Sequence, residues 1–186
     1  MRKTIGIPLD SKFILSIGEL NKNKNHETVI RAIANIDDKS VHYAIAGNGD
    51  LHDYLMKLAN ELGIAERVHL LGYRSDVVDL YRETDLYIHP SLREGLSVAL
   101  MEAMASGLPC VVSDIRGNTD LIDDGKGGFL CKPNDVNGFA QKIRMLLSDR
   151  DLSTSMSVYN INKLKKYDIS AINIQMKKIY QKAAKN

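Results

Sequence analysis

Short apolar segments typical of strands alternate with amphipathic helical segments along this chain, which predicts an α/β fold with a mostly parallel sheet covered by helices on both faces. The composition agrees, because 44% of the 186 residues are hydrophobic, enough for one domain with its own core. Glycine and asparagine also gather where the predicted strands end. Since helical crossovers between parallel strands are right-handed, we expect a doubly wound, Rossmann-like domain of about six strands, followed by C-terminal helices.

The predicted strands are runs rich in valine, isoleucine, leucine and tyrosine that end at glycine, proline or polar residues. The first, KFILSIG, is closed by Gly18, and the second, VHYAIAGNG, ends in Gly47 and Gly49. The third is RVHLLG, and the fourth, DLYIHPS, is followed by a helical segment within PSLREGLSVALMEAMASGLP. We expect the six strands at residues 12–18, 41–49, 67–72, 85–91, 109–114 and 128–132.

Helical periodicity fills the intervals between these strands. Apolar residues recur every three or four positions in HETVIRAIANI, and in DLHDYLMKLANELG they form a stripe that stops at Gly63. The segment SDVVDLYRET predicts a short helix with Ser75 as its N-cap. The helix after the fourth strand is expected to begin at Gly95, and DVNGFAQKIRMLLSD and two further helices complete the chain.

Charge and hydropathy exclude several classes of protein. The net charge of +2 and pI near 8.4 are not typical of a nucleic-acid-binding protein, so no nucleic-acid partner is expected. From Lys163 onward there are seven lysines and one aspartate, which we interpret as a solvated helix face, with contact to an anionic membrane surface as the alternative. No apolar run reaches membrane-spanning length, and MRKTIGIPLD is too short and polar for a secretory signal. We therefore predict a cytoplasmic protein, with peripheral contact at the inner face of the membrane as the alternative.

Neither the cysteines nor the acidic residues predict a metal site. Cys110 and Cys131 are far apart in apolar contexts, so we expect two buried free thiols. Residues 149–151 spell Asp-Arg-Asp, a spacing by which some enzymes hold a divalent cation under a diphosphate. These residues fall between two predicted helices, far in sequence from the strand ends, so we interpret them as a helix-to-helix turn.

The carboxyl ends of the predicted strands share one edge of the sheet, where ligands of doubly wound folds bind. This edge holds most of the chain's unusual glycine, asparagine, arginine and glutamate residues, whereas the apolar residues lie elsewhere. We therefore predict a ligand-binding edge formed by the segments GELNKNKN, GNGD, GYRSD, PSLREG and SDIRGNTD.

Two glutamates, Glu94 and Glu102, flank the expected start of the helix after the fourth strand, with seven residues between them. Free N–H groups in a first turn at Gly95, Leu96 and Ser97 would form an electropositive seat for a phosphate. Glu94 would then accept hydrogen bonds from a sugar attached to that phosphate, and Glu102 from the hydroxyls of a ribose. In the alternative interpretation, Glu94 only complements the helix dipole and Glu102 is a surface residue.

The segment PSLREGLSVALMEAMASGLPCVVSDIRGNTDLI resembles the signature region of the family-4 (group 1) retaining glycosyltransferases, which carry two glutamates separated by seven residues. The segments SIGELNKNKNHETVIRAI, YAIAGNGDLHDYL, RVHLLGYRSDV and GGFLCKPNDV resemble this family in the same order. The resemblance covers nearly the whole chain from Phe13, and is closest to bacterial transferases that build capsular polysaccharide and exopolysaccharide. It implies the C-terminal, donor-binding half of a GT-B fold.

The resemblance implies catalytic roles for Glu94, at the donor sugar, and for Lys24, which would neutralise the departing diphosphate. It places Glu102 at the nucleotide ribose. The backbone amides of Gly95, Leu96 and Ser97 would hold the diphosphate. The remaining donor-binding residues that it implies are Gly18, Glu19 and Gly47, together with Tyr73 and Arg74, which match the loop that frames the base.

Glu19 departs from the family pattern, because many members place an arginine after the equivalent of Gly18 and so have a second cation at the diphosphate. The sequence GELN recurs in the polysaccharide subgroup that this chain resembles, so we interpret Glu19 as marking a variant form of the donor site that is still functional. Arg93 and Arg116 are the alternatives that would supply the missing charge. We interpret Lys22 as a bystander.

The resemblance also implies the substrates. The donor would be a nucleotide-diphosphate sugar, with a UDP-sugar favoured, and transfer to a saccharide or lipid-linked acceptor would need no metal or other cofactor. We expect residues 1–11 to be a connector remnant, residues 12–166 to form the donor-binding domain, and residues 167–186 to form a helix that packs toward an N-terminal, acceptor-binding half absent from this sequence. We therefore expect nucleotide-sugar binding, with little or no transferase activity from this chain alone.

Three other functions remain to be weighed. The first is another enzyme of the same fold, such as a nucleotide-sugar epimerase or a glycogen-type phosphorylase. The second is a non-catalytic nucleotide-sugar-sensing or scaffold module, which has no need for both glutamates and Lys24 together. The third, a dinucleotide oxidoreductase, is disfavoured because GELNKN follows the first strand in place of G-x-G-x-x-G.

Overall fold

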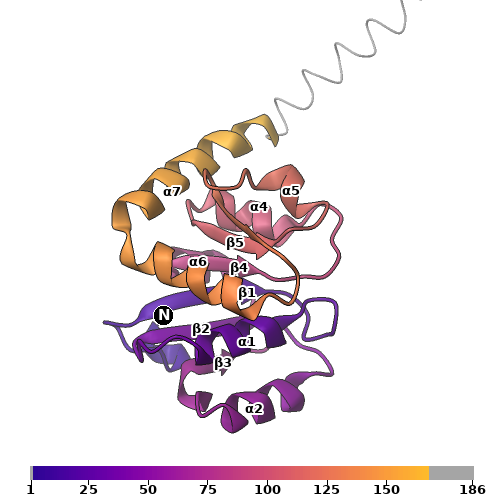
Figure 1. Cartoon of the computed structure of the whole chain (residues 1–186), viewed down its shortest axis with the longest axis vertical. Helices are drawn as coiled ribbons and strands as arrows, with labels where there is room; N and C mark the ends of the chain where they lie inside the picture. The colour runs from indigo at the N-terminus through magenta and orange to yellow at the C-terminus, as the bar shows by residue number, and fades with distance from the viewer. Residues whose placement is uncertain (1, 168–186) are drawn as a thin grey trace, which may run out of the picture.

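The computed structural model describes residues 2–167, which form one layered α/β unit (Figure 1). The expected C-terminal helix at 167–186 and most of the lysine-rich stretch lie outside the described residues, apart from Tyr167 at the end of a short 3-10 turn, η3 (Lys165–Tyr167). Within residues 2–167, none of the helices combines the length and the apolar character that crossing a bilayer requires.

The six predicted strands form a single sheet in the order β3-β2-β1-β4-β5-β6, and every neighbouring pair is parallel. The predicted fold class is therefore confirmed. Each strand is short and mostly buried, as expected for a sheet covered on both faces. The strands are β1 (Lys12–Ile17), β2 (Val41–Ala46), β3 (Val68–Leu70), β4 (Leu86–His89), β5 (Cys110–Ser113) and β6 (Gly128–Cys131).

Helices cover both faces of the sheet, and alternation along the strands divides the core in two. Ile14 of β1 packs with α1, α2 and α6, whereas its neighbours Phe13 and Leu15 pack with α3, α4 and α5. Figure 1 shows α1 and α6 together in front of the sheet, and α7 running on from α6 to lie against α4. The helices are α1 (His26–Ala34), α2 (His52–Glu61), α3 (Val77–Glu83), α4 (Val98–Ala105), α5 (Asn118–Leu121), α6 (Val136–Ser148) and α7 (Arg150–Leu164), with 3-10 turns at η1 (Arg2–Ile5) and η2 (Ala65–Arg67).

The order of the strands in the sheet changes direction at β1: β2 and β3 lie on one side of it, and β4, β5 and β6 lie on the other. β1 pairs with β2 on one side and with β4 on the other, so the connections from these two central strands diverge at their carboxyl ends. Such a topological switch point leaves a crevice in which doubly wound folds bind their ligands. Two loops border it here, residues 18–25 after β1 and residues 90–97 after β4.

Two predicted helix starts are wrong. α3 begins at Val77, and its N-cap residue is Asp76 with no side-chain capping bond, so Ser75 is not the cap. α4 begins at Val98 instead of Gly95, because the hydroxyl of Ser97 accepts a hydrogen bond from Leu100 N at 3.3 Å and thereby fixes the first turn.

The cysteines and the Asp-Arg-Asp sequence take the structural roles that were predicted for them. Cys110 and Cys131 are buried free thiols on the neighbouring strands β5 and β6. Asp149 is the N-cap of α7, and its carboxylate accepts a hydrogen bond from Leu152 N at 2.9 Å. Among the described residues, no group of three or more histidine, cysteine or acidic side chains is placed to hold a metal ion.

Candidate functional site

The two loops at the switch point are joined by hydrogen bonds and form one unit. Asn23 Nδ2 donates to Arg93 O at 3.0 Å, and Leu92 N donates to Asn23 O at 2.8 Å. Asn25 Nδ2 donates to Pro90 O at 3.2 Å. Asn25 itself has a φ of 54°, in the left-handed region that asparagine tolerates better than most residues. The alternating asparagines of GELNKNKN therefore fasten the first loop onto the second.

This fastening brings Lys24 and Glu94 together, although 69 residues separate them in sequence. Lys24 Nζ donates to Glu94 Oε1 at 2.6 Å, and the two side chains are only 22% and 13% exposed. Gly18 lies against the lysine, because a Cβ at this glycine would be 3.3 Å from Lys24 Cδ and Cε. The two residues predicted to be catalytic thus form a partly buried ion pair in the crevice between β1 and β4.

A third group, which the sequence analysis did not identify, completes this cluster. His89, the last residue of β4, is 2% exposed, and its Nε2 lies 3.0 Å from Glu94 Oε1. Ser91 Oγ lies 3.4 Å from the same nitrogen, and the hydroxyl of Tyr87 lies 3.5 Å from His89 Nδ1. The available signal was a histidine at the carboxyl end of an otherwise apolar strand, since a buried polar side chain needs a partner.

The cluster keeps Glu94 ionised. Burial raises the pKa of Glu94, but hydrogen bonds from His89, Lys24 and Ser91 together lower it by more than burial raises it. The pKa therefore falls from 4.5 to about 2. The carboxylate therefore carries a full negative charge at neutral pH, and it can act as an acceptor for hydroxyl groups.

A buried chain of hydrogen-bonded side chains anchors the end of the first loop, residues 18–25, to the sheet. Ser16 Oγ donates to Ile88 O at 2.7 Å, Tyr43 OH donates to Ser16 Oγ at 2.9 Å, and His26 Nδ1 lies 3.1 Å from Tyr43 OH. Desolvation lowers the pKa of His26 to about 3, so this ring is neutral. The chain ties the first residue of α1 to strands β1, β2 and β4.

Five of the predicted donor-binding residues line one hollow of about 280 Å³ beside the cluster. Its wall is crowded at Gly47, where a Cβ would be 2.0 Å from Gly18 O, so only glycine fits there. Tyr73 is 78% exposed, and its backbone N donates to Asn48 Oδ1 at 3.1 Å. The hollow is lined by Ile17, Gly18, Glu19, Ala46, Gly47, Asn48, Tyr73, Arg74 and Val77.

Charge at this hollow differs from the two-cation pattern of the family, from which Glu19 departs. Arg74 Nη2 is paired with Asp76 Oδ2 at 2.6 Å. Glu19 Oε2 accepts from Asn21 Nδ2 at 2.9 Å, so Glu19 is held within its own loop. Arg93 and Arg116, the alternatives for the second cation, are both exposed, and no bond between either side chain and Glu19 occurs in residues 2–167.

Glu102 lies in the second turn of α4, whereas Glu94 lies in the loop before that helix. The hydroxyl of Tyr81 lies 3.1 Å from Glu102 Oε2 and 3.0 Å from Ala99 O. Burial and the neighbouring Glu102 carboxylate raise the pKa of Tyr81. Glu102 lines an open hollow with residues of α4 and of the chain around η3, and no hollow or hydrogen bond of the described chain joins it to Glu94. Helical spacing does not relate the directions of the two glutamates, because Glu94 precedes the helix.

The later start of α4 changes the expected phosphate seat. Gly95 and Leu96 belong to the loop, with Leu96 53% exposed and open space around the Cα of Gly95. Ser97 is buried as the N-cap, and Val98 and Ala99 supply the first two helical N–H groups, which have no intrahelical acceptor. The first helical N–H groups of α4 are therefore those of Val98 and Ala99, and the amides of Gly95 and Leu96 precede them in the loop.

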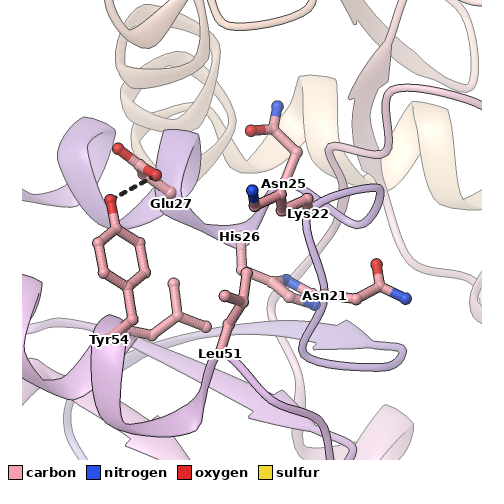
Figure 2. Close-up of a pocket in the computed structure, with 8 residues that line it drawn as sticks. Asn21, Lys22, Asn25, His26, Glu27, Leu51 and Tyr54 are labelled. Carbon is pink, nitrogen blue, oxygen red and sulfur yellow. Dashed lines mark hydrogen bonds between the residues drawn. The ribbon is translucent and has the colours of Figure 1, made fainter.

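Another pocket, of about 310 Å³, lies between the first turns of α1 and α2 (Figure 2). Figure 2 shows Glu27 and Tyr54 facing each other on one side of it, where Tyr54 OH donates to Glu27 Oε2 at 2.7 Å. None of the predicted site residues lines this pocket, so it is separate from the Lys24–Glu94 cluster. Its lining consists of Asn21, Lys22, Asn25, His26, Glu27, Leu51, Tyr54 and Leu55.

Comparison with known proteins gives consistent matches. Residues 1–163 match the family model described as Glycosyl transferases group 1. The chain is 30% identical over 156 residues to UDP-Gal:alpha-D-GlcNAc-diphosphoundecaprenol alpha-1,3-galactosyltransferase of Escherichia coli, covering 81% of this chain and 40% of the relative. It is 31% identical over 157 residues to N-acetyl-alpha-D-glucosaminyl L-malate synthase of Bacillus anthracis, covering 84% and 41% respectively. The chain thus spans about 40% of the length of these relatives.

The fold is also similar to that of a solved structure. Anabaena HepE, crystallised in complex with UDP, superposes with a TM-score of 0.89 at 24% sequence identity. The match covers 97% of this chain and 51% of that chain. At this level of identity the comparison supports the fold alone.

Proposed function

The chain belongs to the group 1 glycosyl transferases, and we propose that it is the donor-binding half of a retaining glycosyltransferase that uses a UDP-sugar. The match covers 40% of the Escherichia coli relative and 51% of the HepE chain, which supports a division into two parts. In the proposal, residues 12–166 bind the donor and residues 1–11 connect to an N-terminal, acceptor-binding half. The proposed acceptor is a saccharide or a lipid-linked sugar, as in the synthesis of a capsular polysaccharide or exopolysaccharide.

The observation that carries this proposal is the Lys24–Glu94 pair at the switch point between β1 and β4. Breaking the bond between the anomeric carbon and the diphosphate leaves negative charge on the departing oxygen. A lysine ammonium held at that place stabilises this charge as it develops. An ionised glutamate beside it can accept hydrogen bonds from the hydroxyls of the transferred sugar, as the low pKa of Glu94 favours.

The hollow around Gly47 and Tyr73 is the proposed site of the uracil base. Gly47 keeps the wall close to the first loop, and the exposed Tyr73 side chain offers an aromatic face beside it. Backbone groups after β3 are suited to distinguish bases, because their donor and acceptor positions are fixed. The Escherichia coli relative that is 30% identical to this chain is named for UDP-Gal, which supports this choice of base.

The diphosphate would bind between Lys24 and the start of α4. In the proposal the N–H groups of Val98 and Ala99 face the phosphate oxygens, with the loop amides at Gly95 and Leu96 contributing from the open side. Glu102, oriented by the hydroxyl of Tyr81, would accept hydrogen bonds from the ribose.

The reaction follows from these placements. The bond from the anomeric carbon to the diphosphate oxygen breaks, and its electron pair stays with the diphosphate beside Lys24. The acceptor hydroxyl oxygen forms the new bond on the same face of the sugar, and its proton passes to the departing diphosphate oxygen. Neither Glu94 nor Glu102 forms a covalent bond in this scheme, and the described residues supply charge and hydrogen bonds without a metal.

Ligand-observed NMR of the 186-residue chain with UDP, GDP and ADP tests the proposal, with Glu102→Ala as the comparison variant. We expect saturable binding of UDP that is strongly weakened in Glu102→Ala. Binding of none of the three nucleotides would contradict donor binding by this chain, and preferential binding of GDP or ADP would contradict the assignment of the base. Binding without transfer by a full-length relative carrying these residues would favour the sensing or scaffold alternative.

A further inference from the structure

His89 belongs to the sheet, so its backbone cannot move without disturbing the pairing of β4. It is the last residue of β4, its side chain is 2% exposed, and its backbone lies in register with Val112 of β5. Lys24, by contrast, extends from a loop and is 22% exposed. A ligand that attracts the lysine therefore leaves the histidine in place.

The proposed function gives Lys24 two anionic partners in turn. Without donor it pairs with Glu94 at 2.6 Å, and with donor bound it would turn to the diphosphate. Glu94 would then lose its cation while remaining mostly buried, which is costly for a carboxylate that has no other partner. His89 Nε2, at 3.0 Å from the same oxygen, is a partner that remains.

The hydrogen-bond pattern specifies which nitrogen of His89 carries the proton. An ionised carboxylate can only accept, so Nε2 must donate to Glu94 Oε1. The phenol of Tyr87, which is fully buried, lies 3.5 Å from Nδ1 and needs an acceptor for its proton. Both contacts favour the tautomer with hydrogen on Nε2 and a lone pair on Nδ1.

On the basis of the proposed function, we infer that His89 is a positioning residue: its Nε2–H holds the Glu94 carboxylate in place to accept hydrogen bonds from the donor sugar after Lys24 turns to the diphosphate. His89 acts on the sugar only through Glu94. The other groups around His89 and Glu94 are Lys24 at the carboxylate, Ser91 beside Nε2 of the ring, Tyr87 beside Nδ1, and the neutral, buried His26 next to the cluster.

The first test uses the unaltered chain. Long-range proton–nitrogen correlation of the histidine rings at pH 8, with His89 identified by the signal that His89→Gln lacks, reports the tautomer directly. We expect hydrogen on Nε2. Hydrogen on Nδ1 would overturn the inference.

The second test follows the carboxyl carbon of Glu94 during an acid titration, identified by comparison with Glu94→Gln. Losing one charge-assisted hydrogen bond in His89→Leu should raise the pKa of Glu94 by about one to two units. His89→Gln, which keeps an N–H donor at the position of Nε2, should stay close to the unaltered chain, and so should His42→Leu, which removes a buried histidine from β2 away from the cluster. An unchanged Glu94 titration in His89→Leu would contradict the inference.

The third test compares UDP-glucose with UDP as probes. In His89→Leu the affinity for UDP-glucose should fall about tenfold relative to UDP, with UDP itself changed by less than about twofold, and His89→Gln should restore the ratio. Equal losses for both probes, or an unchanged ratio, would mean that His89 does not position Glu94 for the sugar. If UDP does not bind the unaltered chain, the proposed function fails for this chain, while the tautomer and the Glu94 titration still decide whether His89 holds the carboxylate.

Discussion

Replacing Glu94 by glutamine removes the charge from the Lys24–Glu94 pair while keeping its size and one carbonyl acceptor. Burial raises the pKa of Glu94, and the hydrogen bonds from His89, Lys24 and Ser91 lower it more, giving a fall from 4.5 to about 2 on folding. At about 1.36 kcal/mol per pKa unit, the ionised form contributes roughly 3 kcal/mol to the free energy of unfolding. Because the pair is partly solvated and glutamine keeps some hydrogen bonds, we expect Glu94→Gln to lose about 2 kcal/mol at pH 7.

The direction in which the stability difference changes with pH follows from the lowered pKa of Glu94. A carboxyl group whose pKa is lowered on folding stabilises the protein at pH values above its unfolded pKa, and this contribution is lost as the pH falls through the folded value. The stability difference between the unaltered chain and Glu94→Gln should therefore be largest above pH 4.5 and shrink toward zero as the pH approaches about 2.

Urea unfolding at pH 7, 4 and 3 measures this difference, with Glu61→Gln as the matched control. Glu61 has a 61% exposed side chain and a long contact of 3.7 Å to Lys57, so its replacement should change stability by less than about 0.5 kcal/mol at each pH. A Glu94→Gln variant as stable as the unaltered chain at pH 7, or a difference that does not shrink in acid, would refute the reasoning.

Three further predictions concern the site and its surroundings. Glu94→Gln should raise the affinity for UDP by about threefold to tenfold in a calorimetric titration, because it removes an anion and releases the paired lysine for the diphosphate; weaker binding would count against this competition. Gly47→Ala should lower the free energy of unfolding by about 2–4 kcal/mol, since its Cβ would lie 2.0 Å from Gly18 O, whereas Gly95→Ala, in open space, should cost less than about 1 kcal/mol; similar costs for both would show that the close approach is not maintained. Asp149→Ala should cost about 1 kcal/mol through loss of the α7 N-cap and leave UDP affinity unchanged with or without Mg²⁺; a loss of Mg²⁺-dependent binding would revive the Asp-x-Asp interpretation.

The fold was predictable because periodicity and strand composition depend on local sequence. All six strands lie within the predicted apolar runs, which end at glycine, proline or polar residues. Helix α2 ends just before Gly63, whose φ is 67°. The helix starts were less predictable, because capping depends on where one side chain points. Ser75 and Ser97 are equally good caps by type, but only Ser97 receives a backbone N–H.

The site was predictable in its residue types and only partly in its geometry. The family resemblance pointed to Lys24 and Glu94, and the structure places them in contact. His89 was missed because its role depends on how the loop after β4 folds back to bring Glu94, five residues later, against the imidazole ring. The function of Asn23 was missed because its bond to the second loop joins residues 70 positions apart in the chain.

The central claim is that Lys24 binds the diphosphate of a nucleotide sugar, and a calorimetric UDP titration of Lys24→Met beside Lys22→Met tests it most directly. Lys22 is the matched control, because it is an exposed lysine of the same loop with the same charge. We predict that Lys24→Met weakens UDP binding about tenfold or more and that Lys22→Met changes it less than about twofold. Equal effects of the two replacements, or none from Lys24→Met, would contradict the account.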